Sequence, residues 1–363
     1  MTIVIFVLEG DILPNTVVDL FCGVGGLTHG LQLAGLNVVA GIDIEPSCKF
    51  AYEANNHAVF INKDITKIPP VTVNNYFNNN GVSILVGCAP CQPFSKYSSR
   101  YRKEGRKDDK WRLLSYFQNI IRQITPDIIS VENVPSLREE EIFINFTDEL
   151  ERLNYHVFSQ VVKCQDYGVP QNRKRLVMLA SRFGDIQLIP PIYQQGQYRT
   201  VRMAIANLPQ IEDGEICATD PLHRASRLSE TNRRRIAQST PGGTWRDWDK
   251  DLILECHKKN TGQTFPSVYG RMEWDKPSPT ITTQFYGYGN GRFGHPEQNR
   301  AISLREGAIL QSFPDDYIFC DEEHNVSKRD VAIQIGNAVP VALGEAIGRS
   351  IINHLVDNHI DFE

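Results

Sequence analysis

Two short segments of the sequence carry side chains that could act together on one substrate. Cys91 lies in the stretch GCAPCQPFS, residues 87–95, directly after an apolar run that is typical of a short buried strand. The prolines of this stretch restrict its backbone, so the thiol is presented in a loop rather than packed in a core. A second apolar strand, residues 127–132, ends in Glu132. A nucleophile and an acid at the ends of neighbouring strands indicate an enzyme.

A glycine-rich loop, residues 19–26 (DLFCGVGG), joins the first predicted strand to the first predicted helix. Such loops let a ligand approach the backbone at a helix N-terminus, although a turn of this kind can also be purely structural. Thr28 stands where the dinucleotide fingerprint has its third glycine, which favours a nucleoside ligand without a pyrophosphate. Asp43 and Asp64 end the next two strands, where Asp43 would bind ribose hydroxyls and Asp64 an adenine amino group.

The elements that would position these residues alternate between strands and helices in the first half of the chain. This alternation indicates an α/β fold with a doubly wound, mostly parallel sheet and helices on both faces. The predicted strands are residues 16–20, 37–42, 59–61, 83–86, 127–132, 155–164 and 175–180, and the predicted helices are residues 27–34, 46–55, 113–124, 303–311 and 339–355. From residue 192 the sequence becomes polar and poorly periodic. We therefore expect a catalytic domain of residues 1–191 plus 298–363 and a smaller, irregular domain of residues 192–297.

The composition is that of an ordinary soluble globular protein. The chain has 363 residues, of which 41% are hydrophobic and 22% charged, and it is long enough for two domains. No apolar run approaches the roughly 18 residues of a membrane span. Residues 3–8 are apolar but lack the features of a signal peptide, so we expect a strand or an upstream extension there. The eight cysteines are scattered, and a reducing cytosol is expected.

The net charge of −5 argues against a polyanionic partner, but the distribution of charge does not. Residues 96–112 carry eight basic and three acidic side chains, and residues 222–272 carry ten basic and five acidic ones. Two basic stretches on an acidic body are what a nucleic-acid groove requires. On charge alone, two solvated loops explain them equally well.

Two other chemistries fit part of the cysteine motif. Cys88 and Cys91 form a C-x-x-C pair, but a polar, basic loop follows instead of the helix that thiol–disulfide enzymes place there. A metal site needs a second Cys or His pair at ligand spacing, and none is evident in the sequence. Residues 169–175 (VPQNRKR) taken alone suggest a solvated basic turn, and residues 335–340 (IGNAVP) a tight turn into the last helix.

Taken together and in order, these segments resemble the DNA cytosine-5 methyltransferase family. The matching blocks are DLFCGVGG from Asp19, PCQPFS from Pro90, ENV from Glu132, QNRKR from Gln171, Arg271 with PTIT from Pro279, LRE from Leu304, QSFP from Gln311 and GNAV from Gly336. The resemblance runs from Thr16 to Ile347, and Ile44 departs from it because members often carry an aromatic residue there against adenine. It implies a class I, Rossmann-like methyltransferase fold that depends on S-adenosylmethionine, with a target-recognition domain at residues 192–297.

The resemblance implies methyl transfer to carbon 5 of a cytosine in a specific short sequence of double-stranded DNA. Cys91 would add to carbon 6 of a base flipped out of the duplex, and Glu132 would bind ring nitrogen 3. Arg173 and Arg175 would activate the thiol and hold the O2 of the base or a phosphate. An RNA cytosine-5 methyltransferase with the same chemistry is the alternative, and a thiol–disulfide enzyme or a binding module fits less of the chain. The sizeable recognition segment and the lack of a Cys-Phe-Thr signature favour DNA.

The resemblance also assigns the binding residues. The cofactor pocket would be formed by Phe21, Gly23, Gly25, Asp43, Ile44, Asp64, Ile65, Pro90 and Asn337, with S-adenosylhomocysteine as product and no metal. Contacts to DNA would come from Gln92, Ser95, Arg227, Arg233, Arg246 and Arg271, by reading guanines or holding phosphates. Such an enzyme is expected to be a cytoplasmic monomer, near the nucleoid in a bacterial host, with a separately acting restriction endonuclease as a partner and no membrane contact.

Overall fold

The computed structural model describes residues 15–78, 80–90, 112–260, 262–321 and 327–360. Three predicted site residues, Cys91, Gln92 and Ser95, lie outside the described residues, and so does the basic stretch 96–111. The other predicted site residues are all described.

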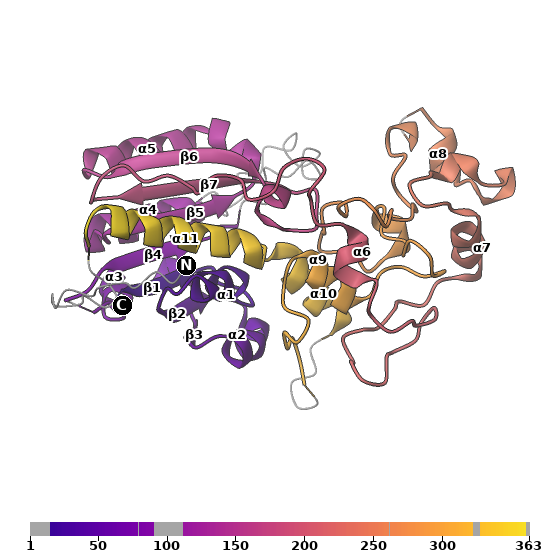
Figure 1. The fold of residues 1–363 in the computed structure, drawn as a ribbon, viewed down its shortest axis with the longest axis horizontal. Coiled ribbons are helices and arrows are strands. Elements are labelled where there is room, and N and C mark those ends of the chain that lie inside the picture. Colours follow the sequence, from indigo (N-terminus) through magenta and orange to yellow (C-terminus); the bar gives the residue numbers. More distant parts are fainter. Residues whose placement is uncertain (1–14, 79, 91–111, 261, 322–326, 361–363) are drawn as a thin grey trace, which may run out of the picture.

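The first lobe is built on one sheet with strand order β3-β2-β1-β4-β5-β7-β6 (Figure 1). Its strands are β1 (Thr16–Leu20), β2 (Val38–Asp43), β3 (Val59–Asn62), β4 (Ser83–Gly87), β5 (Ile128–Asn133), β6 (His156–Lys163) and β7 (Lys174–Ser181). Strands β1 to β5 pair in parallel, whereas β7 is antiparallel to both β5 and β6. The strand order reverses between β1 and β4, where sheets of this kind bind their ligands. The predicted doubly wound, mostly parallel sheet is confirmed.

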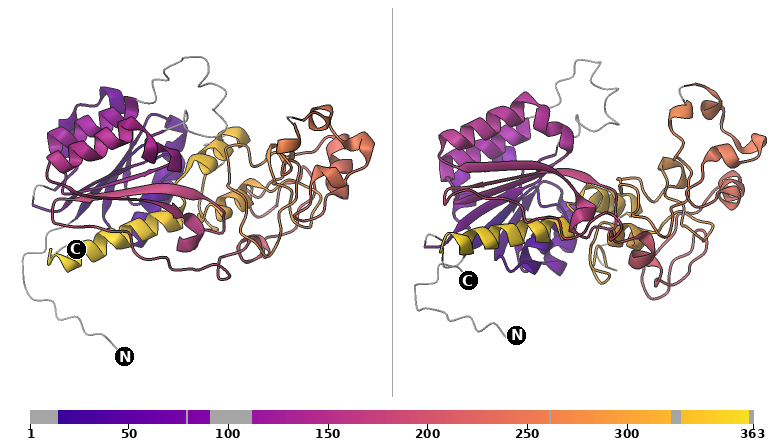
Figure 2. Two further views of the ribbon diagram at one scale, coloured as in Figure 1. Left: turned by 90° about the horizontal axis from the view of Figure 1, so that it is seen from above. Right: turned by 45° about the horizontal axis from the view of Figure 1, so that its top comes forward.

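Helices cover both faces of the sheet (Figure 2). On one face, α1 (Gly26–Leu33) and α11 (Val341–Asp357) bury the even-numbered side chains of β4 and β5, such as Ile84 and Ile128. On the other, α4 (Arg112–Ile124) and α5 (Glu141–Arg152) bury the odd-numbered ones, such as Leu85 and Ile129. Successive side chains of a strand point to opposite faces of the sheet, so residues two apart lie on the same face. The same rule gives the face on which a side chain at a strand end lies.

Three helices of the first lobe were missed in the sequence or were predicted only in part. α2 (Lys49–Asn55) lies inside the predicted helix 46–55, whose first turn is a 3₁₀ helix, Pro46–Cys48. α3 (Pro70–Asn74) and α5 were missed. The apolar residues of α5, among them Phe143, Phe146 and Leu150, do have helical spacing, so the signal was present in the sequence.

The second lobe has little regular structure, as expected for residues 192–297 (Figure 1). The α-helices among its described residues are short: α6 (Val201–Ile205), α7 (Glu230–Gln238) and α8 (Glu255–Lys258). Two later helices, α9 (Leu304–Leu310) and α10 (Lys328–Asn337), pack against each other and, through α9, against α6. Their apolar side chains share one core with Val201, Met272 and Phe285 of the second lobe and with Tyr52 of the first. Residues 300–321 and 327–337 therefore connect the two lobes, and we call these two segments the joint below.

The turn predicted at residues 335–340 is only three residues long in the structure, and the prediction is corrected. Residues 335–337 are the last turn of α10, and only Ala338 to Pro340 connect α10 to α11. In the part of the chain that the structure describes, one helical stretch, Lys328–Asp357, is long and apolar enough by composition to cross a membrane. It is mostly buried within the molecule, which is the usual state of a core helix in a soluble protein.

Candidate active site

Glu132 lies at the carboxyl end of β5, where strand register gives it two neighbours. Gly87 of β4 pairs with Val131, so Cys88 follows beside Glu132, and its Sγ donates a hydrogen bond to Oε2 over 2.8 Å. On the other side, Val177 of β7 pairs with Glu132, so Arg175 is its diagonal neighbour on the same face. Arg175 Nε lies 2.8 Å from Oε1, in ion-pair contact but without hydrogen-bond geometry. The Glu132 side chain is only 2% exposed, so both contacts act in a poorly solvated site.

Asn133, the residue after Glu132, holds the segment that leads to Cys91. Its side-chain amide donates to the carbonyl of Ala89 over 2.9 Å, and its own oxygen accepts from the backbone of Val134. Pro90, the last described residue before Cys91, follows directly. The sequence analysis did not assign Asn133 a role, although the ENV block contained it. The bond joins the ends of β4 and β5 where the predicted nucleophile and acid belong.

Arg173 was predicted to take part in catalysis, and its guanidinium is held by backbone carbonyls. It is buried and donates to the backbone carbonyls of Ile281, Gly336 and Ala338 over 3.1 to 3.5 Å. Burial, together with the positive charge of Arg175, holds the pKa of Arg173 below its ordinary value. Its Nε donates no hydrogen bond to any residue that the structure describes. Arg173 thus fastens the segment before β7 to the joint, and of the two arginines Arg175 is the one in ion-pair contact with Glu132. The catalytic role of Arg173 stays a prediction.

Gln171 explains why the segment 169–175 is not a solvated turn. Its side chain is fully buried, donates to Leu310 and Gln311, and accepts from the backbone of Ile281. Gln311 in turn donates to the carbonyl of Ile335 over 2.8 Å. These amides link the segment before β7 to α9 and α10, so the position of Arg175 depends on the joint.

The glycine-rich loop after β1 has a tight backbone that fits a ligand-binding turn. Phe21, Gly23 and Gly25 all have positive φ, at 62°, 52° and 87°. For Phe21 this conformation is uncommon, which marks a backbone held by its surroundings. The backbone N–H of Gly23 donates to Asp43 Oδ2 over 2.8 Å, and the other oxygen of Asp43 accepts from Glu45. The carboxylate predicted to bind ribose thus also fixes the loops after β1 and β2 relative to each other.

Asp19, at the end of β1, carries an unsatisfied oxygen beside this loop. The side chain is 1% exposed, and Thr28 donates to its Oδ2 over 2.7 Å. Its Oδ1 accepts no hydrogen bond from the described residues. Burial, offset in part by the Thr28 bond, raises the pKa of Asp19 to about 7. A buried carboxyl oxygen without a donor fits a ligand that brings a cationic or N–H group to this loop. The sequence analysis noted this acid but assigned it no role.

The other predicted cofactor residues lie around the same strand ends. Ile44 directly follows Asp43 and is 65% exposed, as a platform for a flat ring would be. Ile65 is buried, and Asn337 ends α10 between two residues that Arg173 binds. Asp64 accepts from the N–H and hydroxyl of Thr66, and these bonds lower its pKa. Among the described residues, no group of three His, Cys, Asp or Glu side chains is placed to hold a metal ion.

The arginines predicted to contact DNA differ in their surroundings. Arg227 is exposed and forms no ion pair with the described residues, whereas Arg233 is paired with Asp213 and Glu230. Arg246 is exposed, lies over the ring of Trp245 and donates to the carbonyl of Gln263. These placements leave Arg227 as the most available of the three.

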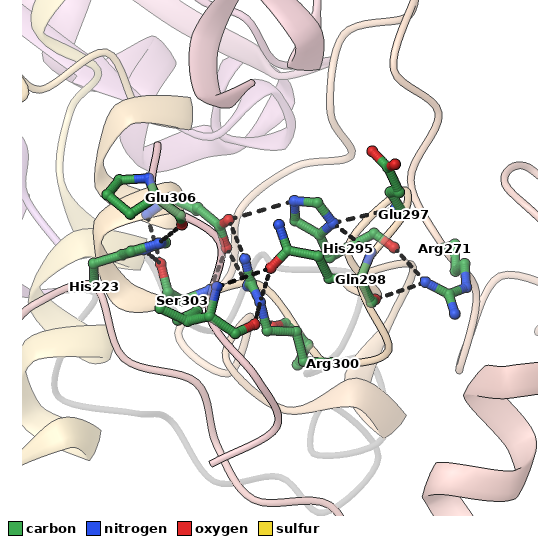
Figure 3. Close-up of polar contacts among 11 residues, drawn as sticks. His223, Arg271, His295, Glu297, Gln298, Arg300, Ser303 and Glu306 are labelled. Carbon is green, nitrogen blue, oxygen red and sulfur yellow. Dashed lines mark hydrogen bonds and ion pairs between the residues drawn. The ribbon is translucent and has the colours of Figure 1, made fainter. Parts of the chain in front are cut away.

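Arg271 does not fit its predicted contact with DNA. It is buried, and its guanidinium donates to the carbonyls of Ile236, Ser239, His295 and Gln298 and to the side chain of Asn299. Figure 3 shows it at one end of a polar network that continues through residues 295–298 to Arg300 and Glu306. At the other end, Ser303 bonds His223. Arg271 thus ties α7 of the second lobe to residues 295–299, which directly precede the joint.

The fold and these residues define a class I methyltransferase-like α/β enzyme with a buried carboxyl group at the end of β5. The family model of C-5 cytosine-specific DNA methylases matches residues 15–353. The chain is 55% identical over 348 residues to the type II methylase M.HgiDII of Herpetosiphon aurantiacus, covering 95% of this chain and 97% of that protein. It is 30% identical over 345 residues to the type II methyltransferase M1.HphI of Haemophilus parahaemolyticus, covering 93% of this chain and 86% of that protein.

Solved structures agree on the fold. A DNA modification methyltransferase encoded within an E. coli prophage has a TM-score of 0.70 at 22% identity, covering 94% of this chain and 99% of that chain. The S. pombe Dnmt2 methyltransferase has a TM-score of 0.61 at 17% identity, covering 94% and 98%. The chain belongs to the C-5 cytosine-specific DNA methylase family and is a DNA (cytosine-5-)-methyltransferase.

Proposed function

We propose that the protein transfers a methyl group from S-adenosylmethionine to carbon 5 of a cytosine in one short sequence of double-stranded DNA. The reaction would proceed through a covalent bond between Cys91 and carbon 6 of a flipped base. The observation that carries the proposal is the position of Glu132. Its buried carboxyl group lies at the end of β5, contacted by Arg175 and one residue from the Asn133–Ala89 bond that holds the segment before Cys91.

The chemistry assigns each residue a task. Carbon 5 of cytosine is a poor nucleophile until a thiolate adds to carbon 6, which makes carbon 5 electron-rich. Glu132 would bind ring nitrogen 3, drawing electrons away from carbon 6 and identifying the base as cytosine. Arg175 would contact the carboxyl group and lie near the O2 of the base. After methyl transfer, loss of the proton from carbon 5 and of Cys91 from carbon 6 would give 5-methylcytosine.

The residues around β1 and β2 fit S-adenosylmethionine, which supplies an electrophilic methyl group on sulfonium sulfur. The cofactor is cationic and carries an ammonium group, and the unsatisfied Oδ1 of Asp19 beside the glycine loop suits such a group. Asp43 would take the ribose, and the exposed face of Ile44 would pack against adenine, with Asp64 and Ile65 beyond it. Phe21, Gly23, Gly25, Pro90 and Asn337 would complete the pocket.

Double-stranded DNA would lie between the lobes, with the second lobe reading the sequence. The type II names of the relatives support a role beside a restriction endonuclease that acts separately. We place the enzyme in the cytoplasm as a monomer.

Bisulfite sequencing tests the activity directly. A plasmid recovered from methylation-free cells that express the protein should show protected cytosines in one short motif. A plasmid from cells that express the Cys91→Ser variant should show none. If the wild-type protein is soluble and leaves every cytosine unprotected, the proposed substrate is wrong, and structured RNA becomes the next substrate to test.

The covalent step has its own test. In a duplex with 5-fluorocytosine at the target, fluorine cannot leave carbon 5 as the proton does, so the bond to Cys91 should persist. We expect a complex that survives denaturing electrophoresis with the wild type and is lost with Cys91→Ser. Cys256→Ala, which removes an exposed thiol on α8, is the matched control and should form the complex normally. A wild-type enzyme that methylates but never forms this complex would contradict the adduct.

A further inference from the structure

The proposed function gives no task to Cys88, the thiol that bonds the predicted catalytic acid. We propose that Cys88 is a positioning residue: its S–H bond to Oε2 fixes the plane of the Glu132 carboxyl group for the incoming cytosine. The inference rests on the proposed role of Glu132 and adds a residue to that site.

The contact between the two side chains is built into the sheet. β4 and β5 are parallel neighbours with Gly87 opposite Val131, so Cys88 and Glu132 are the next residues along each strand. Their side chains point to the same face, and Sγ lies 2.8 Å from Oε2. Asn133 fixes the following residue, Ala89, to the end of β5. Cys88 therefore cannot drift away from Glu132 without breaking the pairing at this strand end.

The two oxygens of Glu132 have different surroundings. Oε2 is held by the thiol, whereas Oε1 is in ion-pair contact with Arg175 and accepts no hydrogen bond from the described residues. A single charge contact outside hydrogen-bond geometry does not fix the rotation of a carboxyl group about its last bond, because that torsion is broad. The hydrogen bond from the Cys88 thiol to Oε2 is the second contact, and together the two contacts fix the orientation of the carboxyl group. Rotation is then restricted before the base arrives, which lowers the ordering needed at the reaction itself.

The test compares Cys88→Ala with Cys88→Ser in methylation of unmethylated plasmid DNA by a methyl-labelled cofactor. For Cys88→Ala we expect kcat to fall about tenfold, as loss of a hydrogen bond to a buried charged group does. The KM for DNA should stay within about twofold, because the thiol is not expected to touch DNA. Cys88→Ser keeps a donor and should restore kcat.

Two results would overturn the proposal: wild-type kcat in Cys88→Ala, or equal impairment of the Ala and Ser variants, which would mean that the thiol only fills space. Cys256→Ala serves as the control for removing a cysteine. Binding of S-adenosylmethionine by each variant, measured by calorimetry, confirms that the site is folded. An inactive wild-type enzyme would contradict the proposed function itself, whereas an active wild type with an unchanged Cys88→Ala variant would contradict this inference alone.

Discussion

Arg300 and Glu306 form a buried bidentate ion pair at the centre of the joint, and both nitrogen–oxygen distances are 2.7 Å (Figure 3). Both side chains are 1% exposed. Glu306 also accepts from the backbone of Ser303 and so completes the capping box that begins α9. Arg300 continues the network to the carbonyl of Ile211 and to Gln298, whose own carbonyl accepts from Arg271. The pair therefore connects α9 to the hydrogen-bond network that reaches Arg271 in the second lobe.

We expect Glu306→Ala to lower the free energy of unfolding by about 3–5 kcal/mol, because it leaves the charge of Arg300 buried without a partner. Urea denaturation of the purified protein measures this. The matched control is Glu345→Ala, which removes the partner of Arg349 in a largely exposed pair and should cost less than about 1 kcal/mol. Equal costs for the two variants would contradict the role given to Glu306.

Stability should fall on acidification because of two groups in the network. Burial lowers the pKa of His295 to about 4. In the unfolded chain the imidazole binds a proton near pH 6.5, whereas in the folded protein it stays neutral until the pH falls toward 4. Its contribution is complete above pH 6.5 and is lost as the pH falls toward 4. Burial opposes ionisation of Glu306, but the hydrogen bonds and charge of Arg300 outweigh it and lower the pKa to about 2. That contribution is present above pH 4.5 and is lost between pH 4.5 and 2.

The effect of His295 can be measured apart from that of Glu306 by unfolding the protein in urea at pH 7.5 and at pH 5. His295 is a neutral acceptor, since its Nδ1 takes bonds from the N–H groups of Glu297 and Gln298, and an Asn oxygen can replace that nitrogen. His295→Asn should therefore reduce the difference in unfolding free energy between the two pH values. His359→Asn, a change at an exposed histidine, should leave the difference as in the wild type. An unchanged difference in His295→Asn would assign the effect to other groups.

Ile44 should contribute to cofactor affinity without contributing to stability. Because its side chain is 65% exposed, Ile44→Ala should leave thermal stability nearly unchanged. Loss of its contact with adenine should weaken S-adenosylmethionine binding by roughly 1 kcal/mol, or about fivefold, in calorimetry. Ile44→Phe should strengthen binding, because an aromatic ring covers more of the adenine. Ile192→Ala, at an exposed isoleucine beside α1 and α11, is the control. Wild-type affinity in Ile44→Ala would place the adenine elsewhere.

Arg227 and Arg271 should behave in opposite ways. Arg227→Ala should fold normally and weaken binding to DNA, with a smaller dependence on salt if the arginine holds a phosphate. Arg271→Ala should lose several kcal/mol of stability, because it leaves the buried carbonyls of residues 236, 239, 295 and 298 without donors. Gel-shift titration at two salt concentrations and urea denaturation measure the two effects. A stable Arg271→Ala protein with weakened DNA binding would restore the original prediction for that residue.

The sequence predicted the sheet well because its signals are local. Apolar runs of strand length, the glycines after β1 and the helical period of residues 113–124 each reflect the packing of a few neighbouring residues. The same holds for Glu132 at its strand end and for Asp43 after β2. The alternation of these signals was enough to indicate a doubly wound sheet, since few topologies allow it.

The roles of the arginines could not be predicted in this way. In the sequence, Arg173 and Arg271 look like any other cation near a functional motif, and both were expected to act on the substrate. Their guanidinium groups are instead buried on backbone carbonyls of segments more than twenty residues away along the chain. An arginine's function depends on whether its partners are carbonyls, carboxylates or a ligand, and those partners are brought together only by long-range packing.

The sequence by itself indicated an enzyme with a nucleophile and an acid at neighbouring strand ends, because those signals are local. The reaction class followed from the resemblance of its ordered motifs to a known family. The tertiary structure decided which of those residues reach the site and which hold it. Strand pairing placed Cys88 and Arg175 on opposite oxygens of Glu132. The packing of α9 and α10 between the lobes turned Gln171, Arg173 and Arg271 into structural ties. These contacts depend on the distances between elements, which local sequence patterns do not encode.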